Sequence, residues 1–333
     1  MRRTLYLHIG SHRTGTTSIQ RFLLKNFATL TKRGYLYPYQ VSRHIKLINE
    51  LFSGKRTVKD AAQNLTERAD RWGSVHSIVL SDEDISTRRD PALLAAFQKD
   101  FDVKVVFFIR RQDLWLESWY FQNIKWQWNP ELSHCTFEQF LAHRDTFHWI
   151  HYNRYIARLE ALFGAENVHL AMFETPQMPD GPVTEFCRQI GLTDMAGLTA
   201  PQHFNASMSA EMVAFIRHLP LDSFNPPERD LLRVALEQVD QVHLRNTTKQ
   251  SERIMPHDLR CSILREYEKG NAALATRRFG RERLFLDPLP DPDAPLARLD
   301  LPADPSEVIH RFVGPLLTRL VQNKTISGDN PKL

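Results

Sequence analysis

The residues best placed to do chemistry lie in a short loop near the N-terminus, between an apolar run and an amphipathic stretch. The loop contains Gly10 and Gly15, one cation, Arg13, and several hydroxyl-bearing residues after the second glycine. Backbone N–H groups at the start of a helix carry partial positive charge and have no partner inside the helix, so an anion fits against them. A strand, a glycine-containing loop and a helix in this order predict a phosphate-binding loop.

The two glycines have the spacing of a Walker A motif, but the lysine of that motif is missing. In G-x-x-x-x-G-K-[ST], the lysine reaches the β- and γ-phosphates of a nucleoside triphosphate. Here Thr16 stands in the lysine position, Thr17 in the Ser/Thr position, and the cation is Arg13, before the second glycine. We therefore expect the loop to enclose a single 5′-phosphate group with backbone N–H groups and the two threonine hydroxyls. Arg13 would lie over whatever leaves from that phosphate.

The elements that must position this loop are predicted along the first 200 residues, where strands alternate with helices. Apolar runs predict strands at 4–10, 34–38, 77–80, 103–109 and 167–173. Apolar residues that recur with a helical period predict helices at 16–30, 42–53, 58–72, 91–97, 112–125 and 183–190. This alternation predicts a three-layer, P-loop-like α/β fold, in which a mostly parallel central sheet is flanked by helices.

Residues suited to ligand binding follow the ends of four of these strands. They are Gly10, the run Ser81-Asp82-Glu83-Asp84, Arg110 and Glu174. Ligands of open α/β sheets bind beyond the carboxyl ends of the strands, so we expect all four groups to lie at one edge of the sheet.

The rest of the chain is predicted to be mainly helical. Helices are expected at 209–218, 228–241 and 256–278, followed by a connector rich in Pro and Asp at 286–305. A last helix at 306–322, kinked at Gly314-Pro315, precedes a polar tail at 323–333. We expect a single α/β domain over 1–285, with its sheet core in 1–200 and a mainly helical part in 205–285.

Composition narrows the class of protein. The chain has 333 residues, 42% of them hydrophobic, and a formal charge of +4, which is too weak to argue for a nucleic-acid partner. Cys135, Cys187 and Cys261 form neither a disulfide framework nor a zinc spacing, which favours a reducing compartment. The N-terminal apolar run is too short for a signal peptide, and no run approaches the about 20 apolar residues of a membrane span. We expect a cytoplasmic protein.

The loop resembles the 5′-phosphosulfate loop of the sulfotransferases that use 3′-phosphoadenosine-5′-phosphosulfate (PAPS), which typically reads P-K-[ST]-G-T-T. The corresponding residues are His12-Arg13-Thr14-Gly15-Thr16-Thr17, and Ser18 continues the pattern as in the bacterial carbohydrate-type branch. The family's 3′-phosphate motif is an arginine that ends a strand and a serine eight residues on, and Arg110 and Ser118 are similar. Phe173-Glu174 gives a weaker match, and the resemblance covers about residues 4–200.

The resemblance implies transfer of a sulfuryl group from PAPS, as co-substrate, to a hydroxyl of a glycan, glycolipid or small molecule, without a metal. The residues implied in nucleotide binding are Arg13, Thr14, Gly15, Thr16, Thr17, Ser18, Arg110 and Ser118. Two other interpretations stay open. One is a P-loop kinase using ATP–Mg²⁺, which the missing lysine disfavours, and the other is a non-catalytic binder of adenosine 3′,5′-bisphosphate. The acceptor and the oligomeric state stay open as well.

Three groups are candidates for the chemistry itself. Arg13 takes the place of the family's lysine, which supports the leaving phosphate, although an arginine cannot give up a proton. Glu83 is the first candidate for the general base, because heparan-type sulfotransferases carry a glutamate base after this strand, and Asp82 and Asp84 compete with it. His12 is the second candidate, since histidine titrates near neutrality. The alternative for the acidic run is a solvated helix cap.

Aromatic and basic residues elsewhere are candidates for further contacts. Trp115 and Trp119 are predicted to be core residues, whereas Trp126 and Trp128 are better candidates for an exposed acceptor site. In the family, a loop of the C-terminal half adds basic contacts to the 3′-phosphate. The candidates here, for which a solvated basic face is the simpler interpretation, are Arg245, Lys249, Arg277, Arg278 and Arg281.

Overall fold

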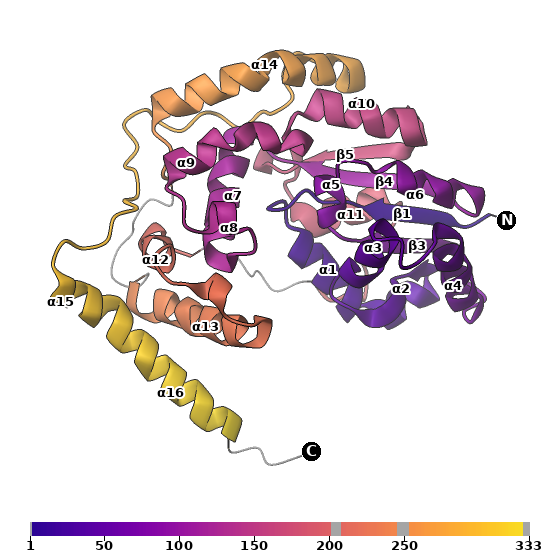
Figure 1. The fold of residues 1–333 in the computed structure, drawn as a ribbon. Helices are drawn as coiled ribbons and strands as arrows, with labels where there is room; N and C mark the ends of the chain where they lie inside the picture. Colours follow the sequence, from indigo (N-terminus) through magenta and orange to yellow (C-terminus); the bar gives the residue numbers. More distant parts are fainter. Residues whose placement is uncertain (1, 201–207, 245–252, 329–333) are drawn as a thin grey trace. The chain divides into compact units, whose positions relative to one another are not determined.

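The computed structural model describes residues 2–200, 208–244 and 253–328 (Figure 1). Contacts among the residues group the chain into two compact units. Unit 1 comprises 1–112, 146–204 and 264–288, and unit 2 comprises 113–145, 205–263 and 289–333. This grouping cuts through the single domain that the sequence predicts over 1–285 and assigns parts of it to both units.

Unit 1 is built on a sheet of five parallel strands in the order β2-β3-β1-β4-β5. The strands are β1 (Thr4–His8), β2 (Tyr35–Leu36), β3 (Ser77–Ser81), β4 (Asp102–Ile109) and β5 (Val168–Met172). Every residue of β3 is buried, as a parallel strand covered on both faces should be. Because all strands run in one direction, their carboxyl ends share one edge, and the predicted α/β fold with a parallel sheet is confirmed.

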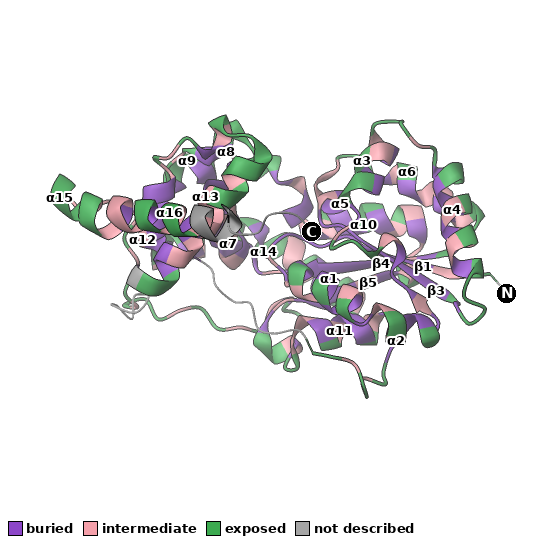
Figure 2. Cartoon of the chain, turned by 90° about the horizontal axis from the view of Figure 1, so that it is seen from below, coloured by how far each residue is buried: buried purple, intermediate pink, exposed green. Residues whose placement is uncertain are grey.

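Helices cover both faces of this sheet and give unit 1 its three layers (Figure 2). On one face, apolar residues of three helices form a core with the strands: α1 (Thr16–Lys25), α2 (Phe27–Lys32) and α11 (Gly181–Gln189). On the opposite face, Figure 2 shows α3 (Ile45–Phe52), α4 (Val58–Asp70), α6 (Ala92–Ala95) and α10 (Tyr152–Phe163). The short helix α5 (Asp84–Thr87) follows β3 directly.

The helix that the sequence predicts over 16–30 is interrupted at Asn26, which lies between α1 and α2. The Asn26 amide group donates to Phe22 O at 2.9 Å and to Thr199 O at 3.0 Å, and its Oδ1 accepts from Thr199 N–H at 2.7 Å. The side chain thus binds a segment far along the chain, and the helical period alone gives no signal of this break.

The described residues of unit 2 form helices and irregular segments. The helices are α7 (Gln112–Trp126), α8 (Pro130–Ser133), α9 (Phe137–Ala142), α12 (Ala210–Ile216), α13 (Pro226–Val239), α15 (Pro305–Val308) and α16 (Gly314–Gly328). Only the first residue of α7, Gln112, is assigned to unit 1. The long helix α14 (His257–Phe279) starts in unit 2 and ends in unit 1. The predicted connector contains no helix or strand between 280 and 304, and the predicted last helix contains a π-helical turn, Ile309–Val313, immediately before Gly314-Pro315.

A buried ion-pair cluster holds α7 to the start of α14 within unit 2. The Arg260 guanidinium is 1% exposed and contacts Asp113 Oδ2 at 2.5 Å and Glu117 Oε2 at 2.9 Å. Glu117 Oε1 also accepts the backbone N–H groups of Ile254 and Met255.

Among the described helices, none is both long enough and apolar enough to cross a membrane.

Candidate functional site

The loop after β1 owes its shape to two glycines with left-handed backbone angles, Gly10 (φ 90°) and Gly15 (φ 81°). A Cβ on Gly10 would lie 2.8 Å from the Cβ of Glu83, and a Cβ on Gly15 would lie 2.7 Å from the Cγ of Pro182. Neither position admits a side chain, so the loop backbone packs directly against Glu83 and against the start of α11. The two glycines are therefore required for this close approach, which fixes the course of the loop that leads into α1.

Helix α1 presents its N-terminus to this loop. Gly15 is the N-cap residue, it supplies no capping side chain, and the first turn contains no acidic residue. The first backbone hydrogen bonds are donated by Ser18, at 3.0 Å, and Ile19, at 3.2 Å, to Gly15 O. Thr16 and Thr17 are the first two residues of α1, and their N–H groups precede these donors, in the position from which helix N-termini donate to anions.

The hydroxyl groups of the loop have different surroundings. Thr14 Oγ1 donates to Ser11 O at 2.6 Å, so this hydroxyl holds the loop in shape, and a ligand would meet Thr14 through its backbone. Thr16 is buried, Ser18 is half-buried and Thr17 is exposed. The three hydroxyl-bearing residues after Gly15 thus differ in their exposure to solvent.

Two arginines from neighbouring strands meet at the loop. Arg110 follows β4, and its Nη1 donates to Arg13 O at 3.2 Å. Burial and the charge of Arg110 lower the pKa of Arg13 to about 10, which leaves Arg13 protonated at neutral pH. Tyr152 fixes the backbone of Arg110, because its hydroxyl accepts from Arg110 N–H at 3.2 Å and donates to Arg110 O at 2.5 Å. The loop therefore concentrates two positive charges beside a helix N-terminus.

Ser118, the second half of the predicted 3′-phosphate motif, lies on α7 within unit 2, whereas Arg110 belongs to unit 1. The pairing of these two residues stays a prediction from the sequence.

A guanidinium that sequence reasoning missed contacts all three acidic residues after β3. Arg43 Nη2 lies 2.7 Å from Asp82 Oδ1 and 2.9 Å from Asp84 Oδ2, and its Nη1 lies 3.5 Å from Glu83 Oε1. Burial alone would lower the pKa of Arg43, but the three carboxylates outweigh it and raise that pKa above its usual value. Arg43 precedes α3 in an irregular segment, so neither period nor motif indicates its contacts.

The three carboxylates differ in what they can do. Asp82 is fully buried, its Oδ1 accepts the Asp84 N–H at 2.9 Å, and both of its oxygens bind Arg43. Burial raises the pKa of Asp82 to about 6 against the opposing hydrogen bond and charge of Arg43. Asp82 thus binds the first backbone N–H of α5, although the N-cap position belongs to Glu83, whose side chain makes no capping bond, and Asp82 is buried rather than solvated.

Glu83 is the carboxylate that packs against the loop. Its Cβ lies beside Gly10, its Oε2 accepts from Gln20 Nε2 at 2.7 Å, and it is 8% exposed. Gln20 is part of α1, so the helix that begins at the loop also orients this carboxylate. Gln20 is a second residue that the sequence did not single out.

His12 links the loop to the acidic cluster. His12 Nε2 lies 2.9 Å from Asp84 Oδ1, and His12 is 4% exposed. Burial alone would raise the pKa of Asp84, but the hydrogen bond from His12 and the charge of Arg43 outweigh it and lower that pKa to about 2. Arg13, His12 and Glu83, the three candidates for the chemistry, therefore all belong to the loop or contact it.

Asp84 should make the stability of the chain depend on acid pH. Its folded pKa of about 2 lies below the value of about 3.9 for an unfolded chain, so its contribution is fully present above about pH 4 and is lost as pH falls toward 2. We expect the free energy of unfolding of Asp84→Asn to lie about 1 kcal/mol below that of the wild type at neutral pH, after allowance for partial exposure of the carboxylate. This difference should narrow below about pH 4. Urea unfolding across this range measures the difference, and a gap independent of pH would contradict the assignment.

The other predicted contacts divide into structural and exposed groups. Trp115 and Trp119 are buried as predicted, whereas Trp128 is 51% exposed and stacks on Trp126 at 4.8 Å between ring centroids. The remaining basic candidates are structural where they are described: Arg277 and Arg278 pair with Glu160, and Arg281 donates to Leu284 O. Arg245 and Lys249 lie outside the described residues.

Glu174, which follows β5, binds the backbone of the connector. Its carboxylate accepts hydrogen bonds from the backbone N–H groups of Leu286, at 2.6 Å, and Asp287, at 3.1 Å.

The part of the chain that the structure describes contains no group of His, Cys, Asp and Glu residues that could hold a metal ion.

Comparison with known proteins gives one structural likeness. No family model matches the chain, and no curated protein is similar to it. Among solved structures, a sulfotransferase from Alicyclobacillus acidocaldarius is similar over 69% of this chain and 100% of its own, with 18% sequence identity and a TM-score of 0.38.

Proposed function

We propose that the chain transfers a sulfuryl group from PAPS to a hydroxyl group of a glycan, a glycolipid or a small molecule. The observation that carries the proposal is the loop itself. It joins a closely packed glycine turn and a helix N-terminus to Arg13 and Arg110, while Thr16 occupies the place of the Walker lysine. Guanidinium groups bind phosphate and sulfate oxygens through paired hydrogen bonds, which favours a nucleotide with several such groups.

Each end of the nucleotide would have its own residues. The 5′-phosphosulfate would accept from the N–H groups of Gly15, Thr16 and Thr17, with the hydroxyls of Thr16, Thr17 and Ser18 as further donors and Thr14 supporting the loop. Arg110 and Ser118, which match the 3′-phosphate motif in the sequence, would bind the 3′-phosphate. The N-terminus of α1 suits a tetrahedral anion because the N–H groups of its first residues have no partner within the helix.

The transfer needs one bond formed and one broken at sulfur. The acceptor oxygen forms the new O–S bond, the bond from sulfur to the 5′-phosphate oxygen breaks, and adenosine 3′,5′-bisphosphate leaves. Arg13 would stabilise the negative charge that develops on the bridging oxygen. The acceptor proton would pass to a general base.

Glu83 is the base that the surroundings favour. Asp82 already binds Arg43 with both oxygens, and the low pKa of Asp84 makes it a weak base at neutral pH. Glu83 packs against Gly10 and is held by Gln20. His12 is the competing base, because Asp84 could orient its ring in the way that an aspartate orients a catalytic histidine.

Transfer of radiolabelled sulfate from PAPS to a panel of saccharides and phenols tests the proposal. We expect labelled product with the wild type and with Arg13→Lys, which keeps the cation, and a rate lower by about 10²–10³-fold with Arg13→Gln. A wild-type chain that binds adenosine 3′,5′-bisphosphate but labels no acceptor would favour the non-catalytic binder. Equal rates for Arg13→Lys and Arg13→Gln would remove Arg13 from the transition state.

A further inference from the structure

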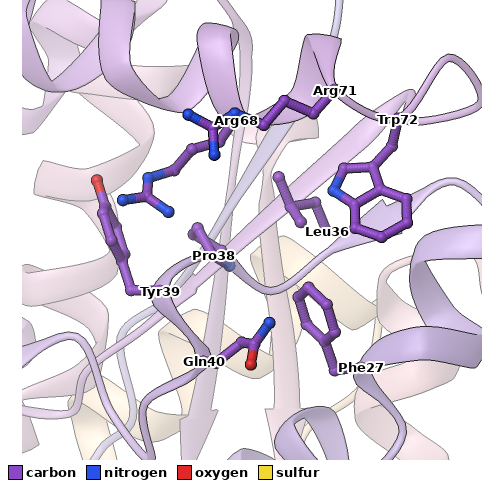
Figure 3. A pocket seen from close by; sticks show the side chains of 8 residues that line it. All are labelled: Phe27, Leu36, Pro38, Tyr39, Gln40, Arg68, Arg71 and Trp72. Atoms are coloured by element: carbon purple, nitrogen blue, oxygen red, sulfur yellow. The ribbon is translucent and has the colours of Figure 1, made fainter.

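A pocket beside β2 combines aromatic walls with two arginines and contains no acid. Its volume is about 380 Å³, and eight residues line it: Phe27, Leu36, Pro38, Tyr39, Gln40, Arg68, Arg71 and Trp72 (Figure 3). All eight belong to unit 1, and none belongs to the phosphate-binding loop or to the acidic cluster. The volume lies within the range of small-molecule sites, which is about 300–1,000 Å³.

The apolar part of the pocket is made by side chains from three segments. Phe27, at the start of α2, and Trp72, just after α4, pack edge to face with 6.3 Å between ring centroids. Leu36 and Pro38 lie between this pair and Tyr39 in Figure 3. Trp72 is 43% exposed, so a large aromatic surface stays open to a ligand.

The two arginines reach over the pocket from the end of α4 (Figure 3). Arg68 is held in place, because its Nε donates to Asn64 Oδ1 at 2.9 Å and its guanidinium lies 4.3 Å from the centre of the Tyr39 ring. The Tyr39 hydroxyl donates to the same Asn64 Oδ1 at 3.0 Å. No carboxylate of the described residues pairs with Arg68 or Arg71, so both keep their positive charge uncompensated.

The backbone of the pocket wall is strained where two of its side chains enter. Tyr39 (φ 67°) and Gln40 (φ 50°) are consecutive left-handed residues, a conformation that favours glycine. Such outliers concentrate at ligand sites, where the side chain is needed in spite of the strain. Here both strained residues line the pocket.

The strained wall is also anchored firmly. Pro38 O accepts from His44 Nε2 at 2.8 Å, while His44 Nδ1 accepts from Ser81 N–H at 3.0 Å, so one imidazole ties the wall to the end of β3. Tyr37 Oη donates to Ser42 O at 3.0 Å. A wall held in this way is organised before a ligand arrives, which reduces the cost of binding.

We propose that this pocket binds a small organic anion, a ring with a flat apolar face that carries a carboxylate or sulfate group. The ring would lie against Trp72 and Tyr39, and the anionic group would accept from Arg68 and Arg71. An aromatic acid and an acidic sugar share this chemistry. The inference does not depend on the proposed sulfuryl transfer, because it uses none of the same residues.

Calorimetry with the full chain tests the site with two pairs of probes. The anions are 2-naphthoate, for the aromatic source, and methyl β-D-glucuronide, for the sugar source, and their neutral counterparts are 2-naphthamide and methyl β-D-glucoside. We expect at least one anion to bind about tenfold or more tightly than its neutral counterpart, and saturating adenosine 3′,5′-bisphosphate to leave its affinity unchanged. Absence of binding by both anions, or their displacement by the nucleotide, would overturn the proposal.

Three variants connect binding to the pocket. Arg71→Gln should abolish the preference for the anion, whereas Lys59→Gln, which removes a positive charge from an exposed position of the same helix, should keep it. Gln40→Gly should weaken binding without lowering the melting temperature, because it removes a pocket side chain and relieves the left-handed backbone together. Equal effects of Arg71→Gln and Lys59→Gln would exclude this pocket as the site.

Discussion

Gly15→Ala is expected to abolish measurable binding of adenosine 3′,5′-bisphosphate while the chain still folds. The new Cβ would lie 2.7 Å from Pro182 and 3.2 Å from the Phe173 ring, and the backbone angle of φ 81° is strained for alanine. The loop must move to relieve both, and the N–H groups of α1 move with it. We expect a loss in affinity of about 100-fold or more, because a preorganised anion site tolerates little displacement.

Gly54→Ala is the matched control for this variant. Gly54 has a similar left-handed angle, φ 73°, but a Cβ there meets nothing within 4 Å. It should therefore lose about 1 kcal/mol of stability from backbone strain and keep its affinity for the nucleotide. Calorimetry for binding and urea unfolding for stability separate the two effects. Wild-type affinity in Gly15→Ala would show that the nucleotide is not held by this loop.

Glu83→Gln is expected to lower kcat by about 10²–10⁴-fold with little change in nucleotide affinity. Glutamine has the shape of glutamate and can still accept from Gln20, so the packing against Gly10 is kept while the base is lost. Sulfate transfer at saturating PAPS and acceptor measures kcat, and calorimetry with the bisphosphate checks that the loop is intact.

Two variants show whether Glu83 acts alone. Asp82→Asn changes the neighbouring carboxylate, which binds the Asp84 N–H and the Arg43 guanidinium. It should reduce kcat far less than Glu83→Gln does. His12→Gln removes the competing base and the contact with Asp84. Full activity in Glu83→Gln together with a large loss in His12→Gln would transfer the role to the histidine.

The parts of the fold that the sequence predicts best are those with strong local signals. Apolar runs predict the parallel strands, and β3 and β4 appear within about one residue of their predicted ends. The helix break at Asn26 was missed because its partner, Thr199, lies far along the chain. Local period carries no information about such contacts.

The candidate site was predictable to the same extent. The two glycines and Arg13 lie in one short segment and the acidic run in another, so each could be recognised as a local motif. Arg43 and Gln20, which hold the acidic run, could not be, because each is a single polar residue that only the fold brings to its partners. The pocket beside β2 was missed for the same reason, since its lining comes from α2, from β2 with the segment after it, and from the end of α4.

Binding of nucleotides to the wild-type chain tests the central claim most directly, because it needs no knowledge of the acceptor. Calorimetry would compare adenosine 3′,5′-bisphosphate, adenosine 5′-monophosphate and ATP–Mg²⁺ under identical conditions. We predict that the bisphosphate binds, that removal of the 3′-phosphate weakens binding by about tenfold or more, and that ATP–Mg²⁺ does not compete. Binding of ATP–Mg²⁺ without binding of the bisphosphate would contradict the account and favour a kinase.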